Sequence, residues 1–162
     1  MKPRRLALIA GVAVAVFVLD RITKAAVVAS LQLNETREVV GDYVRISHVR
    51  NTGAAFGLLP ERTTLLSVLS VFAVVAILYY YRTMTMRSPF IAITLGMQLG
   101  GAIGNLVDRL GQGYVVDFVD VGVGSVRFWS FNVADSSIVV GIALVTFLLW
   151  IEERKAAPGL PA

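Results

Sequence analysis

Two aspartates stand out because no basic residue lies within four positions of either one. Asp117 lies in Val115-Val-Asp-Phe-Val119, and Asp135 lies in Asn132-Val-Ala-Asp-Ser-Ser137. Two carboxylates at close range cannot both ionise cheaply, so one of them keeps a proton near neutral pH. Such a pair supplies a base that activates water and an acid that protonates a leaving amide, as in aspartic proteases.

Each aspartate also has an ordinary structural interpretation. Asp117 could be a solvated strand residue, and Asp135 could be the N-cap of a helix ahead of Ser136 and Ser137. The chain has no Cys and one His, which argues against thiol nucleophiles, thiolate metal sites and histidine zinc sites. It also lacks the Walker A, GxSxG, HExxH and CxxC patterns. We therefore expect chemistry that needs neither a metal nor a cofactor.

The composition points to a membrane protein. Of the 162 residues, 56% are hydrophobic and 16% are charged, against roughly 25% charged in a soluble domain. The mean hydropathy is +0.72, which excludes a disordered chain. The net charge is +4, but the basic residues are scattered among apolar stretches, so we expect a membrane and no nucleic acid as partner.

Four stretches are long and apolar enough to cross a bilayer as helices. They cover about residues 6–29, 64–81, 90–107 and 133–151. The basic start of the first stretch also resembles a signal peptide. However, three further spans follow it, and Asp20 and Lys24 extend it beyond what a cleaved leader needs. We expect one integral membrane domain over residues 1–162. A run of glycines from Gly96 to Gly104 in the third span indicates close helix packing or room for a ligand.

Both chain ends are expected on the cytoplasmic side, since four spans return the chain to the side where it started. The short segments on that side hold seven basic residues, whereas the longer segments on the other side hold six. Segments 30–63 and 108–132 then lie outside. Short strands are predicted around Gly41-Asp42, and a small strand pair over 119–131 is predicted to turn near Gly122–Ser125.

The polar residues of the spans gather at the outer ends. A charged side chain costs roughly 3 kcal/mol at the centre of the bilayer and less near its edge. Asp20 and Lys24 are four residues apart and can form an ion pair on one helical face, and Asp108 has Arg109 beside it. Snorkelling to the interface would explain Arg21, Lys24 and Arg109, but it explains a short aspartate poorly.

A proton- or cation-coupled transporter is the alternative function, because intramembrane aspartates also relay ions. Its carboxylates should lie near the midplane on broken helices. Here they lie toward one side, and no span contains a proline. A non-catalytic membrane subunit is a further alternative.

Five motifs, in order, resemble those of the bacterial lipoprotein signal peptidases of type II. They are Asp20-Arg-Ile-Thr-Lys24, Asn51-Thr-Gly-Ala-Ala-Phe56, Gly100-Gly-Ala-Ile-Gly-Asn-Leu-Val-Asp-Arg109, Val115-Val-Asp-Phe118 and Phe131-Asn-Val-Ala-Asp135. The resemblance implies four transmembrane helices, a small periplasmic β-sheet cradle and a mobile outer loop over the site. It also implies a membrane aspartyl endopeptidase that removes the signal peptide of a diacylglyceryl-modified prolipoprotein, cutting before the lipidated cysteine.

The same resemblance implies roles for individual residues. Asp117 and Asp135 would form the catalytic dyad. A supporting and substrate-binding shell would comprise Asp20, Lys24, Asn51, Gly53, Asn105, Asp108, Arg109 and Asn132. The enzyme would work in the bacterial inner membrane, in contact with lipid, with its site near the outer face, and we expect a monomer.

The loop from Asn51 to Gly57, continuing to Pro60, is predicted to be a mobile lid over the dyad. Its glycines permit unusual backbone angles, and Ala54, Ala55 and Phe56 form an apolar tip that could exclude water. The alternative is that Phe56 is a static anchor in the outer leaflet.

Overall fold

The computed structural model describes residues 3–53, 62–83 and 88–156. Four helices make up most of this part of the chain: α1 (Pro3–Ser30), α2 (Thr63–Thr83), α3 (Pro89–Gln112) and α4 (Val133–Ala156). Each is long and apolar enough to cross a membrane. Four short strands accompany them: β1 (Thr36–Val40), β2 (Val44–Asn51), β3 (Val115–Val123) and β4 (Val126–Arg127). The predicted fold class, four apolar helices with a small sheet, is confirmed.

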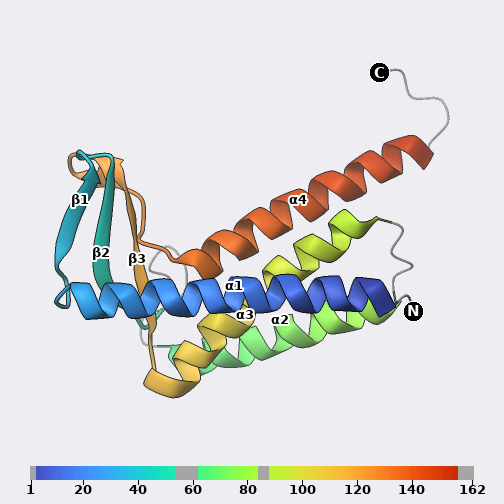
Figure 1. Ribbon diagram of the computed structural model, residues 1–162, viewed down its shortest axis with the longest axis horizontal. Helices are drawn as coiled ribbons and strands as arrows, with labels where there is room; N and C mark the ends of the chain where they lie inside the picture. The colour runs from blue at the N-terminus through green and yellow to red at the C-terminus, as the bar shows by residue number, and fades with distance from the viewer. Residues whose placement is uncertain (1–2, 54–61, 84–87, 157–162) are drawn as a thin grey trace.

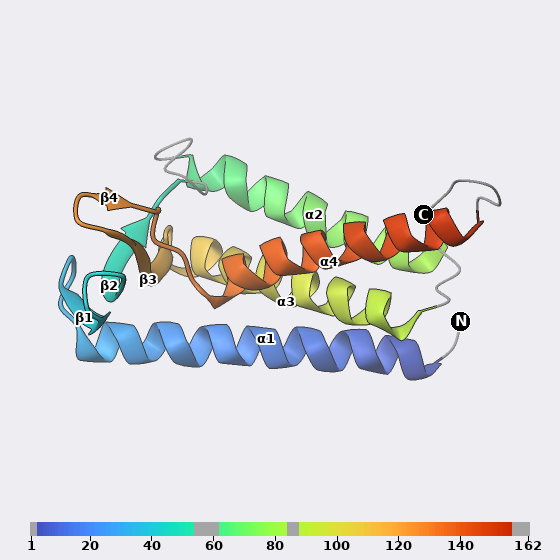
Figure 2. The ribbon, with the colours of Figure 1, turned by 90° about the horizontal axis from the view of Figure 1, so that it is seen from above.

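The helices extend along the long axis of the molecule, with the sheet at one end (Figures 1 and 2). The start of α1 and the end of α4 lie at the other end (Figure 1). Helix α3 is the most buried of the four and contacts α1, α2 and α4. It is therefore the element against which the other helices are positioned.

Glycines allow α3 to approach its neighbours closely. A Cβ on Gly100 would lie 2.5 Å from the carbonyl oxygen of Ala13 on α1, and one on Gly101 would lie 2.5 Å from that of Ala134 on α4. Small residues permit such backbone contacts between helices in membranes, where no hydrophobic effect drives association. Of the two interpretations of this glycine run, the structure supports close packing.

The ends of α3 follow from its terminal residues. Ser88 is the N-cap, and its hydroxyl oxygen accepts a hydrogen bond of 3.2 Å from the backbone nitrogen of Phe90. Pro89 occupies the first turn, where it has no hydrogen bond to lose. Gly113 ends the helix with φ of 79°, a left-handed conformation that favours glycine. Ser88 and Pro89 thus fix where α3 begins, and Gly113 fixes where the chain leaves it toward β3.

The sheet is antiparallel in the order β1-β2-β3-β4. The two predicted turns are confirmed, with Gly41 and Gly124 at φ of 48° and 56°. The second strand pair begins earlier than predicted, however, because β3 starts at Val115 rather than near residue 119. Residues Val115 to Phe118 are all buried. This half of the strand therefore lacks the alternation of apolar and polar residues that is typical of a strand with one buried and one solvated face.

From residue 54 to residue 61, the predicted lid lies outside the described residues. The part of the lid that is described, Asn51 to Gly53, begins with the last residue of β2 and lies at the end of the bundle next to the sheet. The hydroxyl oxygen of Thr63, at the start of α2, lies 3.0 and 2.9 Å from the carbonyl oxygens of Thr52 and Gly113, and its one hydrogen can be donated to either or shared between them. The two ends of this segment are therefore joined to each other and to the end of α3.

Candidate active site

Asp117 and Asp135 line one pocket of about 350 Å³ at the end of the bundle next to the sheet. Asp117 lies in the buried half of β3 and is 2% exposed. Asp135 lies in the first turn of α4. The β3–β4 hairpin returns the chain to the start of α4 (Figure 2). Two aspartates that are separated in sequence therefore line the same pocket.

Two side-chain amides hold Asp117. The Nδ2 atoms of Asn51 and Asn132 donate hydrogen bonds of 2.8 and 2.7 Å to its two carboxyl oxygens. The orientation of each amide is fixed by a second bond. The Asn51 oxygen accepts from the backbone nitrogen of Gly53 at 2.8 Å, and the Asn132 oxygen accepts from that of Asp135 at 2.9 Å. Both amide nitrogens are thereby directed at Asp117.

Asp135 is held in the same manner from another helix. Asn105 on α3 donates a hydrogen bond of 2.7 Å from Nδ2 to Asp135 Oδ1, and the backbone nitrogen of Asn132 donates one of 3.3 Å to Oδ2. Asn132 and Asp135 thus form a reciprocal capping box. The interpretation of Asp135 as the N-cap is wrong, since Asn132 is the cap and Asp135 lies three residues into the helix.

The environment of Asp117 favours its protonated form. The pKa of Asp117 is raised from 3.8 to about 7: burial is the largest cause and the nearby charge of Asp135 adds to it, while the hydrogen bonds from Asn51 and Asn132 oppose the shift. The solvated-strand interpretation of Asp117 is therefore wrong. At neutral pH this carboxyl group can hold or release a proton, as a general acid or base must.

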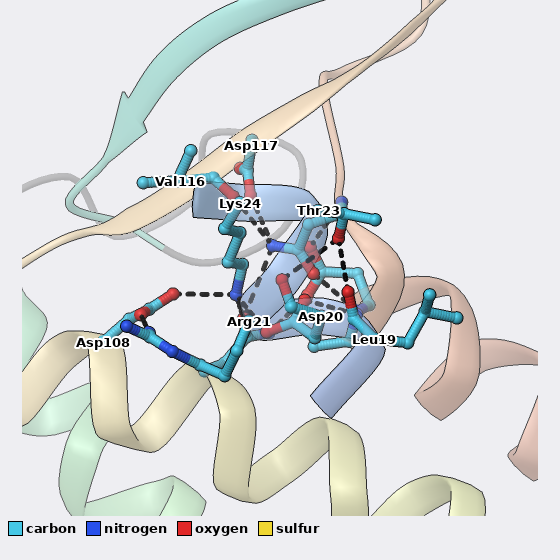
Figure 3. Close-up of polar contacts among 12 residues, drawn as sticks. Leu19, Asp20, Arg21, Thr23, Lys24, Asp108, Val116 and Asp117 are labelled. Atoms are coloured by element: carbon cyan, nitrogen blue, oxygen red, sulfur yellow. Dashed lines mark hydrogen bonds and ion pairs between the residues drawn. The ribbon is translucent and has the colours of Figure 1, made fainter. Parts of the chain in front are cut away.

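Lys24 joins α1 to α3 through contacts to Asp20 and Asp108, as Figure 3 shows. Its Nζ lies 2.7 Å from Asp20 Oδ2 and 2.7 Å from Asp108 Oδ2, and it donates a hydrogen bond of 3.0 Å to Asn105 Oδ1. The Lys24 side chain is 3% exposed. The predicted pair with Asp20 is confirmed, but Lys24 does not snorkel: its ammonium group contacts two carboxylates and one amide oxygen inside the protein.

Asp108 pairs across the helix interface rather than with its neighbour in sequence. Its partners are Lys24 and Arg21, both on α1. The predicted pairing with Arg109 is wrong, because consecutive residues of a helix do not face each other. Arg21 keeps 45% of its side chain exposed, in line with the predicted reach toward the interface.

Asp20 also connects the cluster to α4. Its Oδ1 accepts a hydrogen bond of 3.0 Å from the backbone nitrogen of Ala134 in the first turn of that helix, where an anion is favourable. A Cβ on Gly104 would lie 2.8 Å from Asp20 Oδ2. Glycine at this position therefore leaves the space that Asp20 occupies.

Arg109 lines the pocket with the two carboxylates. It is half-buried. Its Nη2 donates a hydrogen bond of 3.3 Å to the carbonyl oxygen of Gly53. Its buried Nε has no hydrogen-bond partner among the described residues, so a donor remains available at the pocket.

All ten residues predicted for the site lie at this end of the bundle, contributed by α1, the end of β2, α3, β3 and the start of α4. The sequence reasoning missed an apolar wall of the pocket, formed by Val115, Phe128, Trp129, Phe131, Val139 and Val140. The aromatic run from Phe128 to Phe131 lies outside the predicted spans, which is a signal that could have indicated a ligand surface. Among the described residues, no group of three His, Cys, Asp or Glu could hold a metal ion.

The model of the family described as Signal peptidase (SPase) II matches residues 12–151. The chain belongs to the signal peptidase II family. A lipoprotein signal peptidase of Halothermothrix orenii is 40% identical to it over 141 residues, which are 86% of this chain and 92% of that protein. One from Staphylococcus aureus strain JH9 is 30% identical over 138 residues, covering 85% of each chain.

Two solved structures, each described as a bacterial membrane enzyme, share the fold. One has a TM-score of 0.83 at 27% identity and covers 93% of this chain and 92% of its own. The other has a TM-score of 0.76 at 30% identity and covers 85% and 89%. The family resemblance inferred from the five motifs is confirmed. The chain is a peptidase-family member and a multi-pass bacterial membrane protein.

Proposed function

We propose that the chain is an aspartic endopeptidase that removes the signal peptide from diacylglyceryl-modified prolipoproteins, cutting immediately before the lipidated cysteine. The observation that carries this proposal is the shared pocket of Asp117 and Asp135. Neither carboxylate forms an ion pair with a described residue, and each accepts hydrogen bonds from amides instead. Either carboxylate can therefore take up or release a proton without breaking an ion pair.

The reaction needs one proton on the pair. The ionised carboxylate takes a proton from a water molecule, which attacks the scissile carbonyl carbon, while the protonated carboxyl donates a hydrogen bond to the carbonyl oxygen. The tetrahedral intermediate breaks down when the pair delivers a proton to the leaving amide nitrogen. Asn51, Asn105 and Asn132 keep both carboxyl groups oriented toward the pocket throughout.

The position of the pocket suits a substrate that stays in the membrane. Each buried CH₂ of an acyl chain contributes about 0.8 kcal/mol to membrane anchoring, so a doubly acylated cysteine does not leave the bilayer. We infer that the chain ends face the cytoplasm and that the sheet lies on the outer side. The pocket would then meet the lipidated cysteine at the outer leaflet.

Reconstitution tests the proposal directly. The purified protein in liposomes is incubated with a diacylglyceryl-modified prolipoprotein, with the unmodified precursor as control, and the products are identified by mass spectrometry. We expect a product that begins with the lipidated cysteine, and no product from the control. Cleavage elsewhere, or proton or cation flux without cleavage, would overturn the proposal in favour of another function.

Single cysteines test the orientation, because the natural chain has none. Ser125→Cys lies in the exposed turn between β3 and β4. A membrane-impermeant thiol reagent added to intact spheroplasts should label it, whereas Glu153→Cys near the end of α4 should be labelled only after lysis. The opposite pattern would reverse the proposed orientation.

A further inference from the structure

The pocket that holds the two aspartates has a polar end and an apolar wall. Phe128 and Trp129 line it from the segment after β4, and Val139 and Val140 line it from α4. These four side chains are 53%, 58%, 66% and 46% exposed. The wall is therefore a surface open to a ligand rather than part of the packed core, and it adjoins other exposed apolar side chains of α4 such as Leu144 and Phe147.

The segment that carries the aromatic half of this wall has no regular secondary structure. It runs from Phe128 to Asn132 between β4 and α4 (Figure 2). Backbone hydrogen bonds attach it to β3 at both ends, from Phe128 nitrogen to Val121 oxygen at 2.7 Å and from Phe131 nitrogen to Val119 oxygen at 3.1 Å. The direction in which Phe128 and Trp129 project is therefore set by how the β3–β4 hairpin is held.

An ionic clasp holds that hairpin. Arg127, directly before the wall, donates from Nε to Asp120 Oδ1 at 2.7 Å and from Nη1 to the backbone oxygen of Asp42 at 2.9 Å. The Asp42 carboxylate also pairs with Arg45 and accepts a hydrogen bond from the backbone nitrogen of Gly124. These contacts join the turn between β1 and β2 to the turn between β3 and β4, and none of them involves an atom of the dyad.

A close backbone approach supports the same arrangement. A Cβ on Gly122 would lie 2.6 Å from the Cα of Arg127, so this position admits only glycine without a shift of β4. The Gly122 nitrogen also donates a hydrogen bond of 3.0 Å to the carbonyl oxygen of Tyr43. The hairpin is thus fixed at its turn and along its edge.

We propose that Phe128 and Trp129, facing Val139 and Val140, form the subsite for the acyl chains of the substrate, and that the clasp of Asp42, Asp120 and Arg127 positions this subsite. The inference rests on the proposed function. The acyl-bearing cysteine directly follows the bond to be cut, so its glyceryl group must lie in the same pocket as the carboxylates. The wall leads from there to the membrane-facing side of α4, along which the chains can return to the bilayer.

The physics of the bilayer explains why a clasp would matter. Acyl chains leave an equally apolar environment when they enter the subsite, so the hydrophobic effect supplies no binding energy. Affinity must come from van der Waals contact, which falls off steeply when a gap opens between the surfaces. A wall that shifts without losing its apolar character should therefore lose affinity for the chains.

Kinetics with two substrates test the proposal. The dipalmitoylglyceryl and diacetylglyceryl forms of one prolipoprotein peptide differ only in acyl length. We expect Phe128→Ala, Trp129→Ala and Arg127→Met each to raise KM for the long-chain substrate at least about fivefold, equivalent to about 1 kcal/mol. KM for the short-chain substrate and kcat for both should change less than about twofold. Glu38→Gln, which removes a 3.7 Å contact to Arg45 but none to Arg127, is the matched control and should change neither.

Further variants keep the test decisive if Arg127→Met folds poorly. Asp42→Asn keeps an oxygen for the Gly124 nitrogen but loses the charge, and it should show the same selective rise in KM. Combined with Phe128→Ala it should add little, because both changes act on one surface. An equal rise in KM for the two substrates would mean that the wall contacts the peptide, and it would overturn the proposal.

A binding measurement separates this inference from the proposed function. The chain has two tryptophans, so Trp150→Phe leaves Trp129 as the sole tryptophan, which is excited selectively at a wavelength where tyrosine does not absorb. A diacylglyceryl-cysteinyl peptide with brominated acyl chains should quench it saturably, and brominated phosphatidylcholine at equal mole fraction should quench it less. Saturable quenching without any cleavage would retain the subsite and reject the peptidase proposal. Cleavage without selective quenching would retain the peptidase and reject the subsite.

Discussion

Replacement of Lys24 by methionine should strongly destabilise the protein, because this side chain is the buried cation of the cluster between α1 and α3. Lys24 is 3% exposed and lies 2.7 Å from an oxygen of Asp20 and of Asp108. At an effective dielectric constant of 20, each contact corresponds to about 6 kcal/mol of attraction. Most of this is offset by desolvation of the charges in the natural protein. In Lys24→Met both carboxylates stay buried, Asp108 keeps only its pair with Arg21, and Asp20 has no ion pair left among the described residues. We expect a net loss of about 3–5 kcal/mol in the free energy of unfolding.

Arg21→Met is the matched control. Arg21 pairs with the same Asp108, but 45% of its side chain is exposed. Water can therefore replace the contact, and we expect a loss of about 1 kcal/mol or less. A second comparison uses Lys24→Met combined with Asp20→Asn, which removes one uncompensated charge while keeping an oxygen for the Ala134 nitrogen. This double variant should be more stable than Lys24→Met alone.

Unfolding in mixed micelles, followed by circular dichroism, gives these free energies. If Lys24→Met lies within about 1 kcal/mol of the natural protein, or if Arg21→Met is equally costly, the buried-cation argument is refuted. Because Lys24 also donates to Asn105, which donates to Asp135, Lys24→Met should lower turnover as well. Turnover that is preserved in the destabilised variant would confine the role of Lys24 to folding.

Three further predictions follow from the site and the bundle. The pKa of Asp117 is raised to about 7, mainly by burial, so the free energy of unfolding should fall as pH rises from about 4 through 7. Asp117→Asn should flatten this dependence. If the variant and the natural protein lose stability in parallel over this range, Asp117 is not the group that titrates. Chelators should leave cleavage unchanged, whereas a loss restored by added metal would refute the metal-free mechanism. Gly100→Leu should destabilise the bundle by about 1–3 kcal/mol or more through overpacking against Ala13, whereas Gly11→Leu, which meets open space, should not.

Features set by local spacing were accessible from the sequence. Four apolar stretches predicted the four helices, and the spacing of Asp20 and Lys24 predicted their ion pair, because residues four apart share a helical face. The glycines of Gly41-Asp42 and Gly122–Ser125 predicted both hairpin turns. Each of these depends on a period or a backbone conformation that a few consecutive residues determine.

Features set by packing between elements were not accessible. The partner of Asp108 lies on α1, and which helix faces a given side of α3 is decided by the fit of Gly100 and Gly101 against their neighbours rather than by spacing along α3. The aromatic wall was missed for a related reason. Phe128 and Trp129 acquire a role only when the β3–β4 hairpin places them opposite α4.

The dyad itself is tested most directly by single-turnover cleavage of a diacylglyceryl-modified prolipoprotein by Asp117→Asn, Asp135→Asn and the double variant. The exposed Glu38→Gln serves as control, and unfolding curves verify that each variant is folded. We expect each single variant to lose at least about a thousandfold in rate and the double variant to lose little more, since the two residues act as one unit. A folded single variant that cleaves at near the natural rate would remove that aspartate from the catalytic pair and contradict the aspartic mechanism.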